Sequence, residues 1–433
     1  MLKKFYILIL LFIFLQQSFG QKILTFQDSI STYFDEIKVE ANKHQQMWAK
    51  NLYGPILLVN PNTRQLFANF PETAAILKQF GEIYSGILPN EINIANTAVN
   101  WNGRGWAMIM LPLPVYKQDR LNLLGHELFH VSQPSLGFKL FNTENNHLDQ
   151  KDGRIYLRLE LEALKKAIQT NNGTQKKIHL TNALAFRKYR YLLYPGADTT
   201  ENLLELNEGI AEYTGLVISG RNKKQNTDHF VQSINSFLSN PTFVRSFAYQ
   251  TIPIYGYLLD LDNTKNGWNR EITIKTNLTD YFTKAFDISI PTDLKKTTDL
   301  FLNQYNGKAI ISEEKTREEK IKKPIAECKN KFITQSHFEL VFEQMNVSFD
   351  PRNIMPIEDK GNFYPNIRIT DNWGILTVEN GALMSSNWDK ISVTVPLKND
   401  NKNISGDGWT LELKNGFSVT KNETTGNYEL IKK

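Results

Sequence analysis

The chain of 433 residues contains a single cysteine, Cys328, so an intrachain disulfide is impossible. Stability must therefore come from burial of apolar side chains. A hydrophobic content of 41% in a chain of this length can supply that burial in two or more domains. The lack of disulfides is compatible with export to a bacterial periplasm, where disulfides are permitted but not required.

Charge of one sign is also scarce. The formal net charge is only +5, and the Lys and Arg residues form no long block of one sign. This balance is too small to indicate a nucleic-acid partner, and we expect none.

Long hydrophobic runs are limited to the start of the chain. Lys3 and Lys4 precede an apolar run from Phe5 to Leu15, and a small residue, Gly20, follows it. This order of basic start, hydrophobic centre and small-residue end predicts a signal peptide over residues 1–20, cleaved after Gly20. The run is too short to span a bilayer comfortably, and no later segment is long enough. We expect export to the periplasm or the cell exterior, without a stable membrane span after cleavage; an uncleaved membrane anchor is the alternative.

Histidine is scarce as well, with seven in the chain, yet two of them lie four residues apart in the segment 126–130, HELFH. On a helix, His126 and His130 point the same way and can share one metal ion, while Glu127 faces a metal-activated water. Apolar residues at helical spacing, Leu121 and Leu124, favour a core-packed helix here. The segment therefore predicts one Zn²⁺ on the two imidazoles, with Glu127 as the general base of a hydrolysis.

Two histidines need a third protein ligand, and Glu208 in the segment 207–213, NEGIAEY, is the best candidate. The surrounding residues predict a helix that starts near Asp198, with a capping box between Asp198 and Glu201, and ends before Gly220. Small residues around Glu208 would let another helix approach closely. By contrast, we expect the neighbouring Glu205 to lie on a solvated face.

The two segments together resemble the gluzincin group of zinc metallopeptidases, in which an HExxH helix is joined by a glutamate from a later NEGxA-type helix. The resemblance covers the middle of the chain, to about residue 260. It implies a peptide or protein substrate and zinc held by His126, His130 and Glu208. It departs from many gluzincins in one respect, because 78 residues separate His130 from Glu208 and an insertion must fill the gap.

The insertion contains two rival ligands. His147 lies in a polar, turn-like stretch, and Glu160 flanks the apolar stripe of an amphipathic helix. Either residue would keep the hydrolase but move the third ligand.

A tyrosine near the metal commonly stabilises the negative oxygen that develops during amide hydrolysis. By resemblance to the position of the gluzincin tyrosine, Tyr255 in the aromatic segment 247–260 is the first candidate and Tyr249 the second. Glu212 and Tyr213, beside Glu208, are candidates for fixing the histidines through hydrogen bonds.

Composition divides the chain further. Residues 21–115 predict an N-terminal helix and strands, and residues 116–310 a mainly helical metal-binding part. In zinc peptidases of the type that this chain resembles, a sheet edge beside the metal-binding helix pairs with extended substrate, so the strand predicted at residues 105–112 is a candidate for that role; an ordinary core strand is the alternative. Residues 311–329 predict a charged, solvated helical linker that Pro324 closes. Residues 330–433 alternate with period two between turn signals and predict a small antiparallel β domain.

The sequence thus predicts an α+β fold: a helical, zincin-like catalytic domain with an N-terminal sheet, plus a C-terminal β domain. The leading functional hypothesis is an exported zinc metallopeptidase. The alternative is a non-catalytic zincin-like binding module whose C-terminal β domain carries the interaction.

Overall fold

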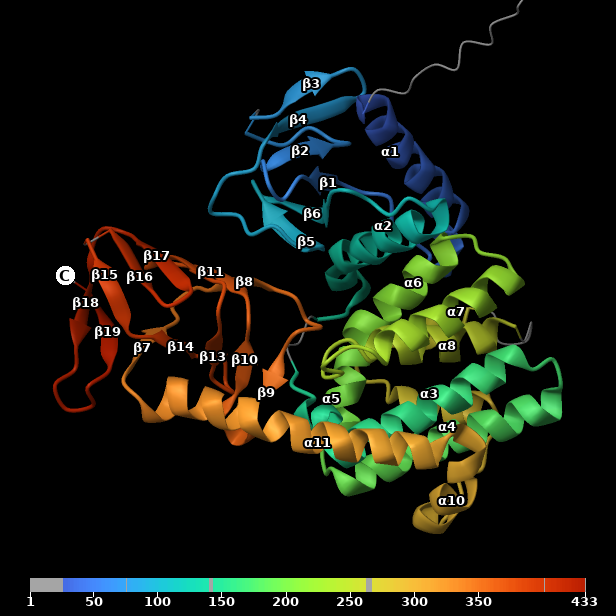
Figure 1. Cartoon of the computed structure of the whole chain (residues 1–433). Helices are drawn as coiled ribbons and strands as arrows, with labels where there is room; N and C mark the ends of the chain where they lie inside the picture. The colour runs from blue at the N-terminus through green and yellow to red at the C-terminus, as the bar shows by residue number, and fades with distance from the viewer. Residues whose placement is uncertain (1–25, 75, 140–142, 262–266, 401, 433) are drawn as a thin grey trace, which may run out of the picture.

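The computed structural model describes residues 26–432, apart from residues 75, 140–142, 262–266 and 401. The predicted signal peptide at residues 1–20 lies outside the described residues. The described chain has an α+β fold, as predicted. An N-terminal sheet lies on one side of a body of helices, and a long helix connects that body to a second β-rich part (Figure 1).

The N-terminal sheet has the order β3-β4-β2-β1-β6-β5, in which β1 and β6 are parallel and the other neighbours antiparallel. Strand β1 (Ile56–Val59) is buried on both faces. Ile56 and Leu58 pack in the core shared with the helices, whereas Leu57 and Val59 pack with Trp106 on the other face. The elements of this part are α1 (Phe26–Lys43), β1 (Ile56–Val59), β2 (Gln65–Ala68), β3 (Lys78–Phe80), β4 (Ile83–Ile87), β5 (Thr97–Trp101) and β6 (Arg104–Met110).

The strand considered as a free sheet edge is β6, and the structure excludes that role in favour of the alternative, a core strand. β6 pairs with β1 on one side and with β5 on the other, so its backbone hydrogen bonds are used on both sides. The edge strand on this side of the sheet is β5, and β3 forms the opposite edge. Period-two patterning identifies a strand but does not reveal its neighbours, which explains why the sequence left both roles open.

The helical body surrounds one large apolar core. Its hairpin of α3 and α4 fills the stretch that the sequence marked as an insertion, and it packs against the helices that follow (Figure 1). The helices are α2 (Lys117–Ser132), α3 (Lys151–Gln169), α4 (Gly173–Leu193), α5 (Ala197–Leu204), α6 (Ile210–Ile218), α7 (Lys223–Phe237), α8 (Ala248–Asp260), α9 (Leu278–Ala285) and α10 (Leu294–Phe301).

The charged linker is part of a long helix, α11 (Gly307–Lys329), which continues through Pro324 rather than ending there. It is also not simply solvated. Glu314 is buried and forms ion pairs with Arg154 and Arg158 of α3. The helix therefore packs along the helical body before it reaches the C-terminal part.

The C-terminal part consists of two packed sheets, mainly antiparallel as predicted, with one parallel pair between β7 and β19. Trp373 and Trp409 are buried between them. One sheet has the order β18-β19-β7-β14-β13-β10-β9 and the other β15-β16-β17-β12-β11-β8. Their strands are β7 (His337–Val341), β8 (Asn346–Phe349), β9 (Met355–Pro356), β10 (Asn362–Tyr364), β11 (Ile367–Asp371), β12 (Gly374–Val378), β13 (Ala382–Met384), β14 (Lys390–Thr394), β15 (Pro396–Asn399), β16 (Asn403–Gly406), β17 (Trp409–Leu413), β18 (Phe417–Lys421) and β19 (Tyr428–Lys432).

Within the described residues, every helix is too short or too polar to cross a membrane.

Candidate metal centre

The HELFH segment lies on α2, and both histidines are buried, at 3% and 8% exposure. The helix packs tightly against α6 because glycines face each other at the crossing. A Cβ placed on Gly125 would lie 3.2 Å from Gly215 Cα, and one on Gly215 would lie 3.1 Å from the backbone nitrogen of His126. Small residues thus bring the two helices together at the histidines, as their positions in the sequence indicated.

Glu208 comes from the turn between α5 and α6, and the structure brings it to the histidines. Its Oε2 lies 3.6 Å from His126 Nε2 and 3.3 Å from His130 Nε2, and the two Nε2 atoms are 2.9 Å apart. All three ligand atoms lie within 4.8 Å of one another. The predicted ligands therefore form one cluster despite their separation in sequence.

The turn that carries Glu208 is a π-helix over Glu205–Gly209, in which the N–H of Ile210 donates to the carbonyl of Glu205 five residues earlier. The wider turn interrupts the 3.6-residue period, and such π turns are frequent at functional sites. It separates the directions of two nearby acids. Glu208 faces the histidines, whereas Glu205 faces Arg187 of α4.

Each histidine is oriented by a hydrogen bond from its other ring nitrogen. His126 Nδ1 donates to Glu212 Oε2 at 2.8 Å, and His130 Nδ1 donates to Gln133 Oε1 at 2.7 Å. Since Nδ1 donates in both rings, Nε2 is the ring nitrogen left to face Glu208 and to offer a lone pair to a metal. This is the tautomer that a metal requires. The expected role of Glu212 thus has a direct structural counterpart.

The cluster fits a tetrahedral zinc ion. With zinc–ligand bonds of about 2.0–2.2 Å, tetrahedral ligand atoms are roughly 3.3 Å apart. The three separations, 2.9, 3.3 and 3.6 Å, scatter around that value. Two neutral imidazoles and one carboxylate are also a donor set that zinc accepts.

Electrostatics favour a cation at the same place. Burial alone would lower the pKa of His126, but the Glu208 and Glu212 carboxylates beside it raise that pKa well above its usual range. The histidines in turn hold the pKa of Glu208 well below its usual range, although burial opposes them. The negative charge that favours protons on these imidazoles would equally favour a divalent cation between them.

Two further side chains face the cluster. Glu127 is buried, and its Oε2 has no hydrogen-bond partner among the described residues. Burial raises its pKa. Tyr249 of α8 donates its hydroxyl to Glu208 Oε2 at 2.6 Å, and its ring stacks on His126 at 5.3 Å. Burial, reinforced by the Glu208 charge, raises the pKa of Tyr249 well above its usual range, so the hydroxyl remains a donor.

The first-choice tyrosine does not reach the cluster, which corrects the expectation for Tyr255. Its hydroxyl donates to Glu160 Oε1 at 3.0 Å, and its ring stacks on Phe282 in the core. Tyr213 also points away from the histidines and donates to Asp260 Oδ2 at 2.7 Å.

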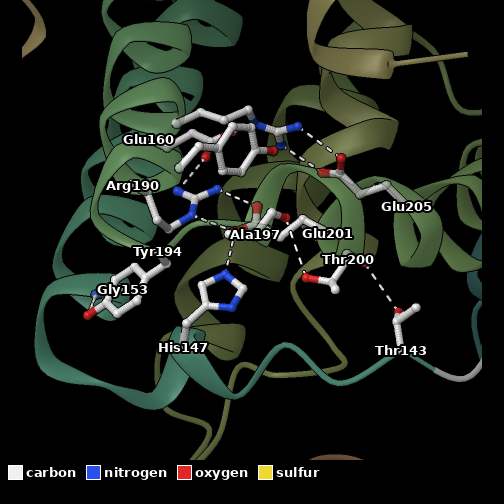
Figure 2. A network of polar contacts seen from close by, with 12 residues as sticks. Thr143, His147, Gly153, Glu160, Arg190, Tyr194, Ala197, Thr200, Glu201 and Glu205 are labelled. Atoms are coloured by element: carbon white, nitrogen blue, oxygen red, sulfur yellow. Dashed lines mark hydrogen bonds and ion pairs between the residues drawn. The ribbon is translucent and has the colours of Figure 1, made fainter.

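The rival ligands belong to a separate buried network behind the π turn. Figure 2 shows Arg190 between Glu160 and Glu201, with His147 on the other side of Glu201. The His147 Nε2 to Glu201 Oε1 distance is 2.8 Å. Glu160 and His147 are thus paired in this network and are not part of the metal cluster.

The same network corrects two details of the sequence reading. Glu205, expected on a solvated face, is fully buried and binds the Arg187 guanidinium through both oxygens, at 2.7 and 2.9 Å. Glu201, expected in a capping box, instead binds Arg190, and this pairing holds its pKa at about 2 against the effect of burial. The α3–α4 insertion therefore anchors the segment that presents Glu208.

Two residues of the centre were missed from sequence. Gln133 joins the two halves of the site, since its Nε2 donates to the carbonyl of Asn207 at 2.8 Å while its Oε1 accepts from His130. Asn122 donates to Glu212 at 2.8 Å. Asn122 lies one helical turn before His126, and Gln133 lies three residues after His130, so position relative to the histidines was a usable signal for both.

The cluster opens into a cavity of about 270 Å³. One wall is the edge strand β5 with the residue before it, and another comes from the C-terminal β part. The lining residues are Asn96, Thr97, Ala98, His126, Glu127, His130, Asn207, Glu208, Arg245, Tyr249, Val347, Phe349 and Trp388.

Comparisons with known proteins give no match to this chain among protein-family models, curated proteins or solved structures.

Proposed function

We propose that this chain is an exported, zinc-dependent metallopeptidase of the gluzincin type that hydrolyses peptide or protein substrates. The observation that supports this most strongly is the convergence of His126, His130 and Glu208 beside a buried, unpaired oxygen of Glu127. A purely structural zinc site usually has four protein ligands and needs no adjacent base, whereas a catalytic site has three and keeps one position open.

In this proposal His126, His130 and Glu208 hold the zinc. A zinc ion bound there would lower the pKa of a water molecule and polarise the scissile carbonyl. Glu127 takes the proton from the attacking water and then delivers it to the leaving amine nitrogen. Its burial raises its pKa, which suits an acid that must give the proton back.

Tyr249 takes the role first expected of Tyr255. Its hydroxyl is held at the cluster by Glu208 and is a donor at neutral pH. Turning to the substrate, it would donate to the carbonyl oxygen as negative charge develops there. The edge of β5 lines the same cavity and offers backbone groups for pairing with an extended peptide.

The test combines metal analysis with digestion of a peptide library. His126→Ala and His130→Ala should lose both zinc and activity, while His44→Ala, outside the cluster, should keep both. Glu127→Gln should retain zinc while turnover falls by several powers of ten, with the exposed Glu423→Gln as the matched control. Stoichiometric zinc in either histidine variant would refute the metal assignment.

Tyrosine variants separate the chemistry from simple binding. Tyr249→Phe should keep zinc and lose about 10²–10³ in turnover, as expected for loss of one oxyanion donor. Tyr255→Phe should leave folded protein with turnover close to normal. Wild-type protein that binds zinc but cleaves no library peptide would favour the non-catalytic binding module instead.

A further inference from the structure

The wall of the cavity contributed by the C-terminal β part is fixed in place. Asn93, in the loop before β5, donates to the carbonyl and to the side-chain oxygen of Asn346, both at 3.0 Å. Ser348 Oγ donates to the carbonyl of Ile94 at 3.1 Å. These bonds fasten β8 to the loop that leads into the edge strand, so the β8 side chains facing the cavity have a defined position.

A second attachment orients Trp388, which lines this wall together with Phe349 of β8. Glu144, on the chain between α2 and α3, accepts from Trp388 Nε1 at 3.1 Å and from Asn362 Nδ2 at 2.6 Å. Its other oxygen accepts from Asn146 at 2.9 Å. The Oε1 atom of Glu144 therefore holds the β part against the helical body, while its Oε2 atom is engaged locally by Asn146.

Among the residues that line this cavity, Arg245 is the one that carries a guanidinium or ammonium group. It precedes α8, one helical turn before Tyr249, and its guanidinium lies over the Phe349 ring at 5.7 Å from the centroid. Among the described residues, its guanidinium makes neither a hydrogen bond nor an ion pair. Elsewhere in the helical body, buried arginines such as Arg187 and Arg190 are paired with carboxylates.

A half-buried guanidinium has five N–H donors in a planar fork that matches a carboxylate. The guanidinium nitrogens of Arg245 remain accessible in the cavity, so a carboxylate that enters can replace their hydrating water with charge-assisted hydrogen bonds. Burial raises the pKa of Glu144 and the charge of Arg245 opposes that effect, but the Glu144 oxygens already accept hydrogen bonds from Trp388, Asn362 and Asn146. A ligand that enters the cavity can therefore supply the anion that pairs with the Arg245 guanidinium.

We propose that Arg245, with Phe349 and Trp388, forms a subsite that binds a carboxylate of the substrate; this rests on the proposed peptidase function. The guanidinium pairs with the carboxylate and the two aromatic rings cover the adjoining hydrocarbon. The carboxylate belongs either to an acidic side chain or to the C-terminus of the peptide. The C-terminal β part is thus a component of the substrate site rather than a separate module.

The test uses four matched peptides that differ only in carboxylates: internal Glu or Gln, each with a free or amidated C-terminus. Wild-type protein should cleave at least one carboxylate peptide with a kcat/KM about 10- to 100-fold above that of the neutral peptide, the range of a charge-assisted pair. Arg245→Met should abolish that preference, so that the ratio of kcat/KM between the carboxylate and neutral peptides falls to about one. The peptide that responds identifies which carboxylate is read.

Arg245→Lys keeps the charge without the fork and should recover only part of the preference. If Arg245→Met does not fold, Arg245→Lys and Arg245→Gln provide the same comparison. Equal kcat/KM for carboxylate and neutral peptides in wild-type protein would overturn the subsite while leaving the peptidase intact.

Binding provides a readout independent of turnover. Fluorescent versions of the four peptides are titrated into zinc-loaded Glu127→Gln protein and into the Glu127→Gln, Arg245→Met double variant. A 10- to 100-fold weaker affinity of the double variant, confined to carboxylate peptides, supports the subsite even if wild-type protein hydrolyses nothing, in which case only the peptidase proposal fails. Unchanged affinity overturns the subsite.

Discussion

Gly215→Ala should disturb the metal centre without touching any ligand. An added Cβ would lie within 2.3 Å of the Asn122 carbonyl oxygen and 3.1 Å from the His126 nitrogen, both on α2. An ordinary contact needs about 3.3 Å, so the two helices must separate by about 1 Å, and packing strain of this kind typically costs about 1–3 kcal/mol. Since Glu208 and Glu212 lie on the α6 side, both would move away from the histidines.

A shift of about 1 Å is large for a zinc site, where distances are fixed within about 0.2 Å. It also loosens the hydrogen bond between Glu212 and His126, and losing such supporting contacts typically costs about 10- to 100-fold in metal affinity. Gly215→Ala should therefore lower both the free energy of unfolding and the zinc affinity.

Urea denaturation of metal-free protein measures the first effect, and competition with a chromophoric chelator measures the second. Gly173→Ala is the matched control, because a Cβ at this first residue of α4 meets nothing within 4 Å. The control should be neutral or slightly stabilising, as expected when Gly is replaced at a compatible helical position. A Gly215→Ala variant with the unfolding free energy and zinc affinity of wild type would refute the close-packing argument.

Two further predictions concern stability. Arg187→Met leaves the buried carboxylates of Glu160 and Glu205 without a shared partner and should lower the unfolding free energy by about 3–5 kcal/mol in urea denaturation; a loss below about 1 kcal/mol would contradict it. Burial raises the pKa of Asp260 to about 6, although hydrogen bonds from Tyr213 and Trp268 lower it. Because folding raises this pKa, the stability that Asp260 contributes is present below about pH 4 and is lost as the pH rises through 6. Asp260→Asn should therefore remove about 2 kcal/mol of the pH dependence of unfolding between pH 4 and 7, and identical pH profiles for both proteins would contradict this.

The local parts of the site could be predicted because helical periodicity is a property of adjacent residues. Because residues four apart on a helix lie on the same face, His126 and His130 could be predicted to point the same way. The small residues near Glu208 indicated a close helix crossing. The fold class followed from the same patterns. The bridge made by Gln133 could not be foreseen, since its partner, the Asn207 carbonyl, is 74 residues away.

The tyrosines show why the remaining assignments needed the structure. Tyr249 and Tyr255 are six residues apart on α8, so their side chains differ by roughly 240° around the helix and cannot both face the metal cluster. Helical periodicity fixes the angle between the two tyrosines but does not tell which of them faces the π turn. Tyr255 faces away because it donates to Glu160, which lies on α3, 95 residues away in sequence.

Buried charge was the other source of error. An acid on a helix usually faces solvent, which is why the sequence predicts a solvated Glu205. Its partner, Arg187, lies on α4, and the sequence gives no sign that the two residues meet. A composition pattern cannot distinguish a solvated acid from one that is paired in the core. The position of the C-terminal β part could not be predicted for the same reason. Its alternating residues predict strands, but Trp388 is placed at the cavity by a hydrogen bond to Glu144, far away in the sequence.

The long separation between His130 and Glu208 in sequence does not weaken the site, because hydrogen bonds next to each of these residues fix both ends of the insertion. At its start, Gln133 ties His130 to the backbone immediately before Glu208. At its end, Arg187 on α4 holds Glu205 from the opposite side of the π turn. The position of Glu208 is therefore determined by residues one turn away from each ligand, and the α3–α4 hairpin between them supplies the arginine without entering the metal cluster. In the proposed metal site, a ligand set built in this way is preorganised, which is the condition under which three ligands can hold an ion while leaving a position for substrate.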